Sequence, residues 1–233
     1  MGRKIDNILD ILNFYKALGF KELPDNFLNP ILESVNNLTE SLEQINPLKN
    51  IEELNQKIKS CVRCSLSSSR KNVVCGEGSI NANLMFVGEA PGFDEDIQGR
   101  PFVGEAGKLL TSLIEKMGFT REEVYITNTV KCHPPQNRDP KEEEILACSD
   151  YLKKEIELIS PKVIMTLGKI ATYTLKGMVG KVKDIQISKI RGNVFYYDNI
   201  PVIPTFHPAY LLRNRKDKWL TWEDAQEALR RLK

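Results

Sequence analysis

Three short apolar runs, separated by segments with helical periodicity, constrain the fold of this chain more than any other feature. The runs are Asn83–Gly88, Val124–Asn128 and Val163–Leu167. Each is shorter than an ordinary buried helix and ends at a glycine or a polar segment. Runs of this kind are typical of strands in a parallel sheet that is covered on both faces.

Helical patterns fill the intervals between these runs. They lie at about 104–117, at 141–159 and after Gly168, and a last helix is expected from near Thr221. Two further strand-like runs, around 193–198 and 201–205, precede that helix. Because strands alternate with helices, we predict an α/β fold with a mostly parallel sheet and helices on both faces.

The N-terminal part has a different pattern. Apolar residues recur with helical spacing over 4–18 and 31–45, and glycine or proline residues flank both segments. We therefore predict an N-terminal helical extension over 1–50, followed by the main domain over 51–233, whose first helix is expected at about 51–59. The apolar stripes of the extension serve either packing or the binding of a protein partner.

Length and composition suit an ordinary soluble domain. The 233 residues are 41% hydrophobic and 27% charged, enough for one α/β domain with a small appendage. No apolar run approaches the roughly 18 residues that span a membrane, and the N-terminus lacks the features of a signal peptide. We expect a cytoplasmic protein with no membrane partner. Residues 57–233 carry 28 Lys and Arg against 22 Asp and Glu, an excess that suits a polyanionic partner.

The cysteines point to chemistry rather than to disulfides. There are five, Cys61, Cys64, Cys75, Cys132 and Cys148, and an odd number argues against a disulfide framework. The CxxC spacing of the first two fits a metal site, a redox dithiol or chance. With Cys132 and Cys148 the pair supplies four thiolates, which suit a tetrahedral zinc ion or an iron–sulfur cluster. A zinc ribbon usually has two CxxC pairs, so the spacing does not select zinc.

Unusual polar segments follow the expected strands, at the edge where parallel sheets bind ligands. The first, Gly88–Gly92 (GEAPG), matches no phosphate-binding fingerprint. Its glycines and prolines favour a rigid turn that lets a substrate approach the backbone. Glu89 and the acidic residues at 94–96 either form a solvated capping loop or position water or a neighbouring side chain.

Three side chains in these segments are candidate functional groups. His207 lies in a proline-flanked loop at a strand end, although lone histidines are more often structural. Phe102 belongs either to the core or to a platform that stacks on a flat ligand. Asn128 carries a donor and an acceptor on one amide, which suits the reading of a nucleobase edge.

Seven motifs, in order along the chain, resemble the family 4 uracil-DNA glycosylases, the iron–sulfur branch of the uracil-DNA glycosylase superfamily. The resemblance runs from about residue 55 to the C-terminus and leaves 1–50 outside. The motifs are the CxxC at 61–64, GEAPG at 88–92 with Glu95 and Asp96, GRPFVG at 99–104, ITNTVKC at 126–132, PPQNR at 134–138, Cys148, and FHPAYLL at 206–212.

The resemblance implies a three-layer α/β/α sandwich around the sheet. It also implies a [4Fe–4S] cluster held by Cys61, Cys64, Cys132 and Cys148, with Cys75 outside the cluster.

Catalytic roles are implied for three residues of this chain. His207 would donate a hydrogen bond to uracil O2 as negative charge develops there. Glu89 would help to hold the attacking water, and Glu95 would support it. Substrate contacts are implied for four others: Ala90 would line the pocket, Phe102 would stack on the flipped uracil, Asn128 would bond its Watson–Crick edge, and Asn137 would help to hold it.

The implied activity is hydrolysis of the N-glycosidic bond of a uracil flipped out of DNA, which leaves an abasic site for base excision repair. The expected partner is uracil-containing DNA, the expected state is a monomer, and in a prokaryote the protein would associate with the nucleoid. One alternative is a broader deaminated-base glycosylase, but its family 5 relatives typically lack an acidic residue at Glu89. Another is a non-catalytic iron–sulfur DNA-binding module, against which Glu89, Asn128 and His207 argue together.

Two positions depart from the family pattern. His133 stands where the family often has arginine, and Ala90 offers no side-chain base. The identity of a general base is therefore open.

Overall fold

The computed structural model describes residues 47–178 and 186–233. Both helices expected in the extension, over 4–18 and 31–45, lie outside these ranges. The description begins with helix α3 (Pro47–Lys59), which starts four residues before the expected 51. Proline suits the first position of this helix, because it lacks an N–H that a first-turn residue leaves unpaired in any case.

A six-stranded sheet forms the centre of the domain, in the order β1-β3-β2-β4-β6-β5. Strands β3, β2, β4 and β6 are parallel, and β1 and β5 pair antiparallel at the two edges. The expected mostly parallel sheet is confirmed. Only β1 had no sequence signal, because two residues are too few to show a pattern. The strands are β1 (Glu77–Gly78), β2 (Leu84–Gly88), β3 (Tyr125–Asn128), β4 (Val163–Leu167), β5 (Phe195–Tyr197) and β6 (Ile200–Thr205).

The long helices agree with the sequence pattern and the short ones escaped it. Helices α5 (Glu105–Lys116), α6 (Glu142–Ile159), α7 (Lys169–Leu175) and α10 (Lys218–Leu232) match the expected segments. Helices of six residues or fewer are too short for a 3.6-residue period to show. They are α4 (Phe93–Gln98), α8 (Ile187–Ile190), α9 (Pro208–Arg213) and the 3₁₀ turns η1 (Ser65–Ser68), η2 (Pro135–Asn137) and η4 (Arg215–Asp217).

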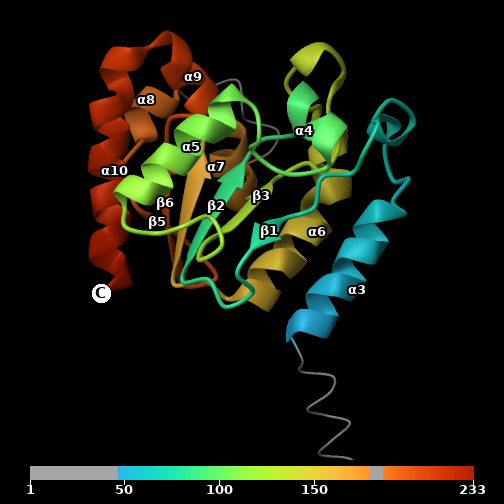
Figure 1. Cartoon of the computed structure of the whole chain (residues 1–233), viewed down its shortest axis with the longest axis horizontal. Helices are drawn as coiled ribbons and strands as arrows, with labels where there is room; N and C mark the ends of the chain where they lie inside the picture. Colours follow the sequence, from blue (N-terminus) through green and yellow to red (C-terminus); the bar gives the residue numbers. More distant parts are fainter. Residues whose placement is uncertain (1–46, 179–185) are drawn as a thin grey trace, which may run out of the picture. The chain divides into compact units, whose positions relative to one another are not determined.

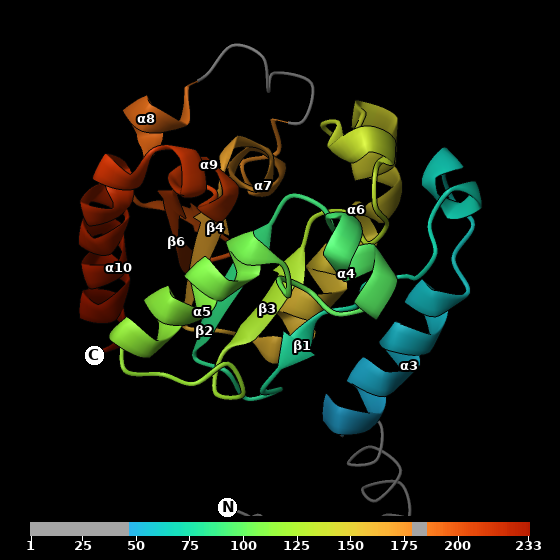
Figure 2. The same cartoon turned by 45° about the horizontal axis from the view of Figure 1, so that its top comes forward.

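Helices cover both faces of the sheet. Successive residues of a strand point to opposite faces, so each buried strand contributes side chains to two cores. On β2, Leu84 and Phe86 face a core that α5 and α10 complete. Met85 and Val87 face a second core, which includes residues of α3, α6 and α7. Figures 1 and 2 both show α5 on one side of the strands, and α6, with α3 alongside it, on the other. The expected three-layer arrangement is confirmed.

The parallel register brings the carboxyl ends of the central strands together at one end of the sheet. Gly88 at the end of β2 lies opposite Asn128 at the end of β3, and Leu167 at the end of β4 lies opposite Thr205 at the end of β6. The loops after β2, β3 and β6 therefore leave the sheet on the same side, and His207 follows β6 by two residues. No helix in the described ranges is long and apolar enough to cross a membrane.

Candidate functional site

One pocket of about 560 Å³ lies at the carboxyl ends of the parallel strands. Four residues that the sequence did not single out, Ala106, Tyr210, Arg138 and Arg213, are part of its lining. All seven residues with expected catalytic or substrate-binding roles also line it: Glu89, Ala90, Glu95, Phe102, Asn128, Asn137 and His207.

Phe102 and Asn128 meet over Gly88. A Cβ atom built on Gly88 would lie 2.3 Å from Asn128 Oδ1 and 2.4 Å from Phe102 Cζ. The absence of a side chain at Gly88 thus lets a ring and an amide approach the same point on the pocket floor. His207 completes the group, since its ring centroid is 5.9 Å from that of Phe102, with 35° between the planes.

The side-chain oxygen of Asn128 is an acceptor without a partner. Asn128 is 2% exposed, and its Oδ1 has no hydrogen bond in the structure. Buried polar atoms are nearly always paired, because an unpaired one costs the full desolvation free energy. An unpaired carbonyl oxygen in the lining of a pocket fits a ligand that brings its own N–H group.

Phe102 has a backbone conformation that other residues enforce. Its φ is +52°, in the left-handed region that non-glycine residues seldom adopt. Arg121 donates from Nη1 to the Phe102 carbonyl at 3.1 Å and from Nη2 to the Pro101 carbonyl at 2.8 Å. Gly107 leaves room for that turn, because a Cβ there would lie 2.0 Å from the Phe102 carbonyl oxygen. The ring is held in place at the cost of local strain.

His207 is neutral and has one nitrogen committed. Its Nδ1 accepts a hydrogen bond from the Ala209 N–H at 3.2 Å, at the start of α9. Burial lowers the pKa of His207 to about 4, and the nearby Glu95 carboxylate only partly opposes this. A neutral imidazole that accepts at Nδ1 carries its proton on Nε2. His207 therefore has a neutral N–H donor to offer.

Glu89 has an unusually high proton affinity. Burial in the pocket wall, together with the charge of Asp139, raises its pKa to about 7, although Lys169 acts in the opposite direction. Lys169 is itself paired with Asp139 at 2.7 Å. A carboxyl group with a pKa near neutrality suits proton exchange with water.

Glu95 lines the pocket, but its oxygens are engaged by the backbone. Oε1 accepts from the N–H groups of Val103 and Gly104 at 2.8 and 2.9 Å, and Oε2 accepts from Gly92 at 3.1 Å. The carboxylate thus ties the loop after β2 to the segment that carries Phe102. This geometry fits the supporting role that the family resemblance implied for Glu95.

Asn137 lies at the exposed mouth of the pocket. It follows Gln136, and both have positive φ values, 53° and 59°. Its Oδ1 is 2.9 Å from His133 Nε2. His133, the residue that departs from the family pattern, therefore contacts the substrate-binding candidate Asn137.

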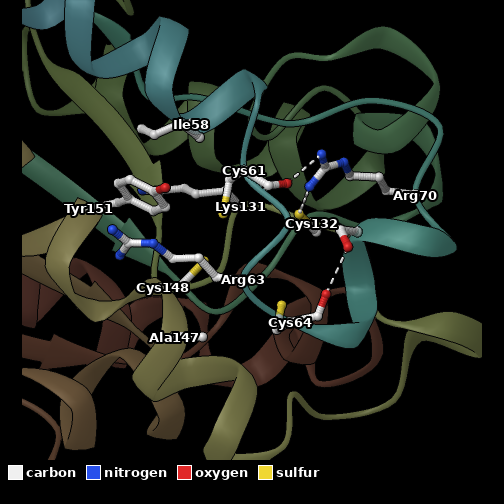
Figure 3. A pocket seen from close by; sticks show the side chains of 11 residues that line it. Ile58, Cys61, Arg63, Cys64, Arg70, Lys131, Cys132, Ala147, Cys148 and Tyr151 are labelled. Atoms are coloured by element: carbon white, nitrogen blue, oxygen red, sulfur yellow. Dashed lines mark hydrogen bonds between the residues drawn. The ribbon is translucent and has the colours of Figure 1, made fainter.

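A second, smaller pocket gathers the four predicted thiol ligands. Cys61 and Cys64 follow α3, Cys132 follows β3, and Cys148 lies on α6; all four line this pocket. Figure 3 shows their sulfur atoms around a common space. Cys75 lies outside the lining, with its Sγ 3.8 Å from the Asn55 carbonyl oxygen. In the described ranges, no group of three or more His, Cys, Asp or Glu side chains is arranged to hold a single metal ion.

Cations surround these thiols. Arg70 donates to Cys132 Sγ at 3.1 Å and to the Cys61 carbonyl at 2.8 Å (Figure 3). Arg63 stacks over the Tyr151 ring at 4.8 Å, and both line the pocket. Burial raises the pKa of Cys148 to about 11 and also raises that of Cys132, where the Arg70 hydrogen bond opposes it. Ligation of a metal would remove these protons.

Several residues in or next to the two pockets were missed by sequence reasoning. Arg121 and Arg70 act on groups 19 and 62 positions away, and nothing in a single sequence reveals such partners. Glu155, a buried carboxylate, did have a signal. It lies seven residues after Cys148 on α6, and hence on the same face of that helix.

Comparison with known proteins agrees with this geometry. Residues 75–233 match the family model of the uracil DNA glycosylase superfamily. A type-4 uracil-DNA glycosylase of Saccharolobus solfataricus is 50% identical over 184 residues, which cover 76% of this chain and 84% of the relative. One of Thermotoga maritima is 46% identical, over 76% and 92%. A type-5 enzyme of Pyrobaculum aerophilum is only 32% identical, over 66% and 72%. The chain therefore belongs to the type-4 branch of the uracil-DNA glycosylase superfamily.

Proposed function

We propose that the protein is a DNA repair glycosylase that hydrolyses the N-glycosidic bond of uracil flipped out of DNA. The observation that carries the proposal is the unpaired Asn128 Oδ1 on the pocket floor, beside Phe102 and His207. Uracil brings an N3–H donor to that acceptor. Cytosine brings a lone pair at the same ring position and would leave the buried oxygen unpaired.

The flipped base lies against the Phe102 ring in this proposal. Stacking on an aromatic face stabilises a bound base by roughly 1–3 kcal/mol. Because Arg121 and Gly107 set the Phe102 backbone, the ring is in position before the base arrives. At the pocket mouth, Arg213 adds positive charge for the flanking phosphates, and Asn137 helps to hold the nucleotide. Arg138 lines the same pocket, but its guanidinium is paired with Glu144 at 2.7 Å.

His207 stabilises the leaving group. When the bond between the sugar C1′ and uracil N1 breaks, its electron pair moves to the base, and negative charge develops at O2. The neutral Nε2–H of His207 donates to that oxygen. Such a donor contributes most in the transition state, where the charge appears. The pKa of about 4 keeps His207 neutral at physiological pH.

Glu89, with Ala90 beside it in the pocket wall, holds the water. The sugar is left cationic at C1′, and the water oxygen bonds to that carbon. A carboxylate with a pKa near 7 can accept the proton that this water loses. Glu95 acts as a positioning residue, since it fixes the loop that carries Glu89 through its bonds to backbone N–H groups.

The thiol pocket is proposed to hold a [4Fe–4S] cluster through Cys61, Cys64, Cys132 and Cys148. The donor set supports this assignment: four thiols line one space, with no carboxylate or imidazole among the lining residues. Arg63, Arg70 and Lys131 supply positive charge next to thiolates, which suits a group with a net negative charge. When bound, the cluster would cross-link α3, the loop after β3 and α6.

A single-turnover cleavage assay tests the proposed activity. Oligonucleotides that carry uracil, hypoxanthine, xanthine or thymine are incubated with iron-loaded protein and then treated with alkali, which breaks the strand at an abasic site. We expect cleavage at uracil alone, without added metal ion. Intact uracil-DNA would contradict the proposal, and equal cleavage at hypoxanthine or xanthine would favour the broader glycosylase. We also propose that the protein acts as a monomer.

A further inference from the structure

A buried ion pair joins Lys131, which lines the thiol pocket, to Glu155, which has no role in the mechanism described so far. Lys131 Nζ lies 2.6 Å from Glu155 Oε2, and the two side chains are 1% and 0% exposed. A buried ion pair is a poor source of stability, because desolvation of the charges offsets their attraction. The pair therefore calls for a role other than holding the fold together.

The contacts of this pair lead to the base-reading residue. Besides Glu155, Lys131 Nζ donates to Thr127 Oγ1 at 2.6 Å and to the Asn128 carbonyl oxygen at 2.7 Å. All three ammonium donors are thus used. Glu155 reinforces the arrangement, since its Oε2 also accepts from Thr127 Oγ1 at 2.9 Å. The end of β3 is clamped from α6.

The clamp acts on Asn128 through its main chain. Its Oδ1 has no hydrogen bond in the structure, so no bond at that atom fixes where the acceptor points. Its place is set by packing against Gly88 and by the position of its own main chain. Lys131 donates directly to that main chain.

The same pair adjoins the thiol pocket. Lys131 lines that pocket and immediately precedes Cys132, and Figure 3 shows it among the cysteine side chains. Glu155 lies on α6, seven residues after Cys148. The elements that carry two of the four thiols therefore also carry the two charges that hold Asn128.

We propose that Lys131 is a positioning residue for uracil recognition: it holds the Asn128 acceptor in place, with Glu155 as its anchor on the thiol-bearing helix. The proposal rests on the proposed function of the Asn128 pocket and adds the residues that fix its geometry. A clamp of this kind matters because a misplacement of about 1 Å can cost a hundredfold in rate.

A double-mutant cycle tests the proposal. The variant Lys131→Met/Glu155→Gln removes both charges together and leaves no unpaired buried ion, so we expect it to fold and to retain iron. Its single-turnover rate of uracil excision should fall by about tenfold or more relative to the wild type. In an Asn128→Ala background, the same two substitutions should change the rate by less than about threefold, because a clamp has no effect once its target is gone.

Other variants keep the test decisive. Lys131→Gln retains one donor toward the Asn128 carbonyl and should give an intermediate rate, which can be measured if the double variant does not fold. Tyr125→Phe is the matched control: Tyr125 contacts Glu155 at 3.5 Å without reaching Asn128, and its rate should equal that of the wild type. Iron content and melting temperature are measured for every variant.

Two results would overturn the positioning role. One is an equal loss of rate in the Asn128 and Asn128→Ala backgrounds, which would show a general structural effect. The other is wild-type excision by a folded variant that lacks the Lys131 ammonium. Uracil excision by the wild type is measured in the same series, so a wild type without activity would count against the proposed function instead.

Discussion

Gly88→Ala is the substitution whose effect the structure specifies most closely. The added methyl carbon would lie 2.3 Å from Asn128 Oδ1 and 2.4 Å from Phe102 Cζ. Ordinary contact with a Cβ begins at 3.4 Å, so each group must retreat by about 1 Å. Because both are the proposed contacts of the base, we expect a loss of excision rate of about a hundredfold. That loss corresponds to about 2.7 kcal/mol of transition-state stabilisation.

The assay is single-turnover excision of uracil at saturating enzyme, with the melting temperature measured in parallel. Gly118→Ala is the control. It adds the same methyl group at a position with nothing within 4 Å, although its φ of +89° strains any side chain. We expect it to lower stability and leave the rate unchanged. A folded Gly88→Ala variant with a rate within about threefold of the wild type would refute the geometry of the pocket floor.

Three further predictions concern the pH dependence, base selectivity and thiols. The excision rate should rise with pH through about 7, since the raised pKa of Glu89 leaves its carboxyl protonated below that value. Glu89→Gln should flatten the pH–rate profile over pH 5–9, and an unchanged profile would exclude Glu89 as the group that accepts the proton from water. Asn128→Asp should lower uracil excision about tenfold and admit cytosine, because an acceptor replaces the amide donor; an oligonucleotide panel that shows neither would count against base contact. Cys148→Ser should lose iron and lower the melting temperature while Cys75→Ser keeps both, and zinc without iron in anaerobic wild type would contradict the cluster.

The sequence predicted the layered architecture because burial imposes a visible pattern on long elements. A strand covered on both faces is buried along its whole length and therefore mostly apolar, as β2 and β4 are. Helices of twelve residues or more show their buried stripe, as α5 and α6 do. The six-residue helices α4 and α9 turn too few times for a period to emerge.

The grouping of the pocket residues was also predictable in part. Parallel strands bring the residues that follow them to one edge, which placed Asn128 and His207 together in the expectation. Phe102 was already a candidate as either a core residue or a stacking platform, whereas Asn137 came only from the family resemblance. The structure adds why Phe102 can serve there: its strained turn is held by Arg121 from a distant loop.

The contacts that escaped prediction are polar and tertiary. Arg70 beside Cys132, Arg121 beside Phe102 and Lys131 beside Glu155 each join segments whose separation is fixed only by the fold. A single sequence carries no record of which polar side chain meets which backbone group. A buried charged residue can be predicted from the sequence only where helical spacing relates it to a residue already identified, as it relates Glu155 to Cys148.

In the proposed mechanism, uracil excision depends on a neutral His207 donor that acts in the transition state. The most direct measurement compares His207→Ala with the wild type in two ways: the single-turnover excision rate, and the affinity for uracil-DNA. Loss of one such donor should lower the rate by about 10² to 10³ and change the affinity by less than about threefold. An equal fall in rate and affinity, or a folded His207→Ala variant with the wild-type rate, would contradict the role proposed for His207.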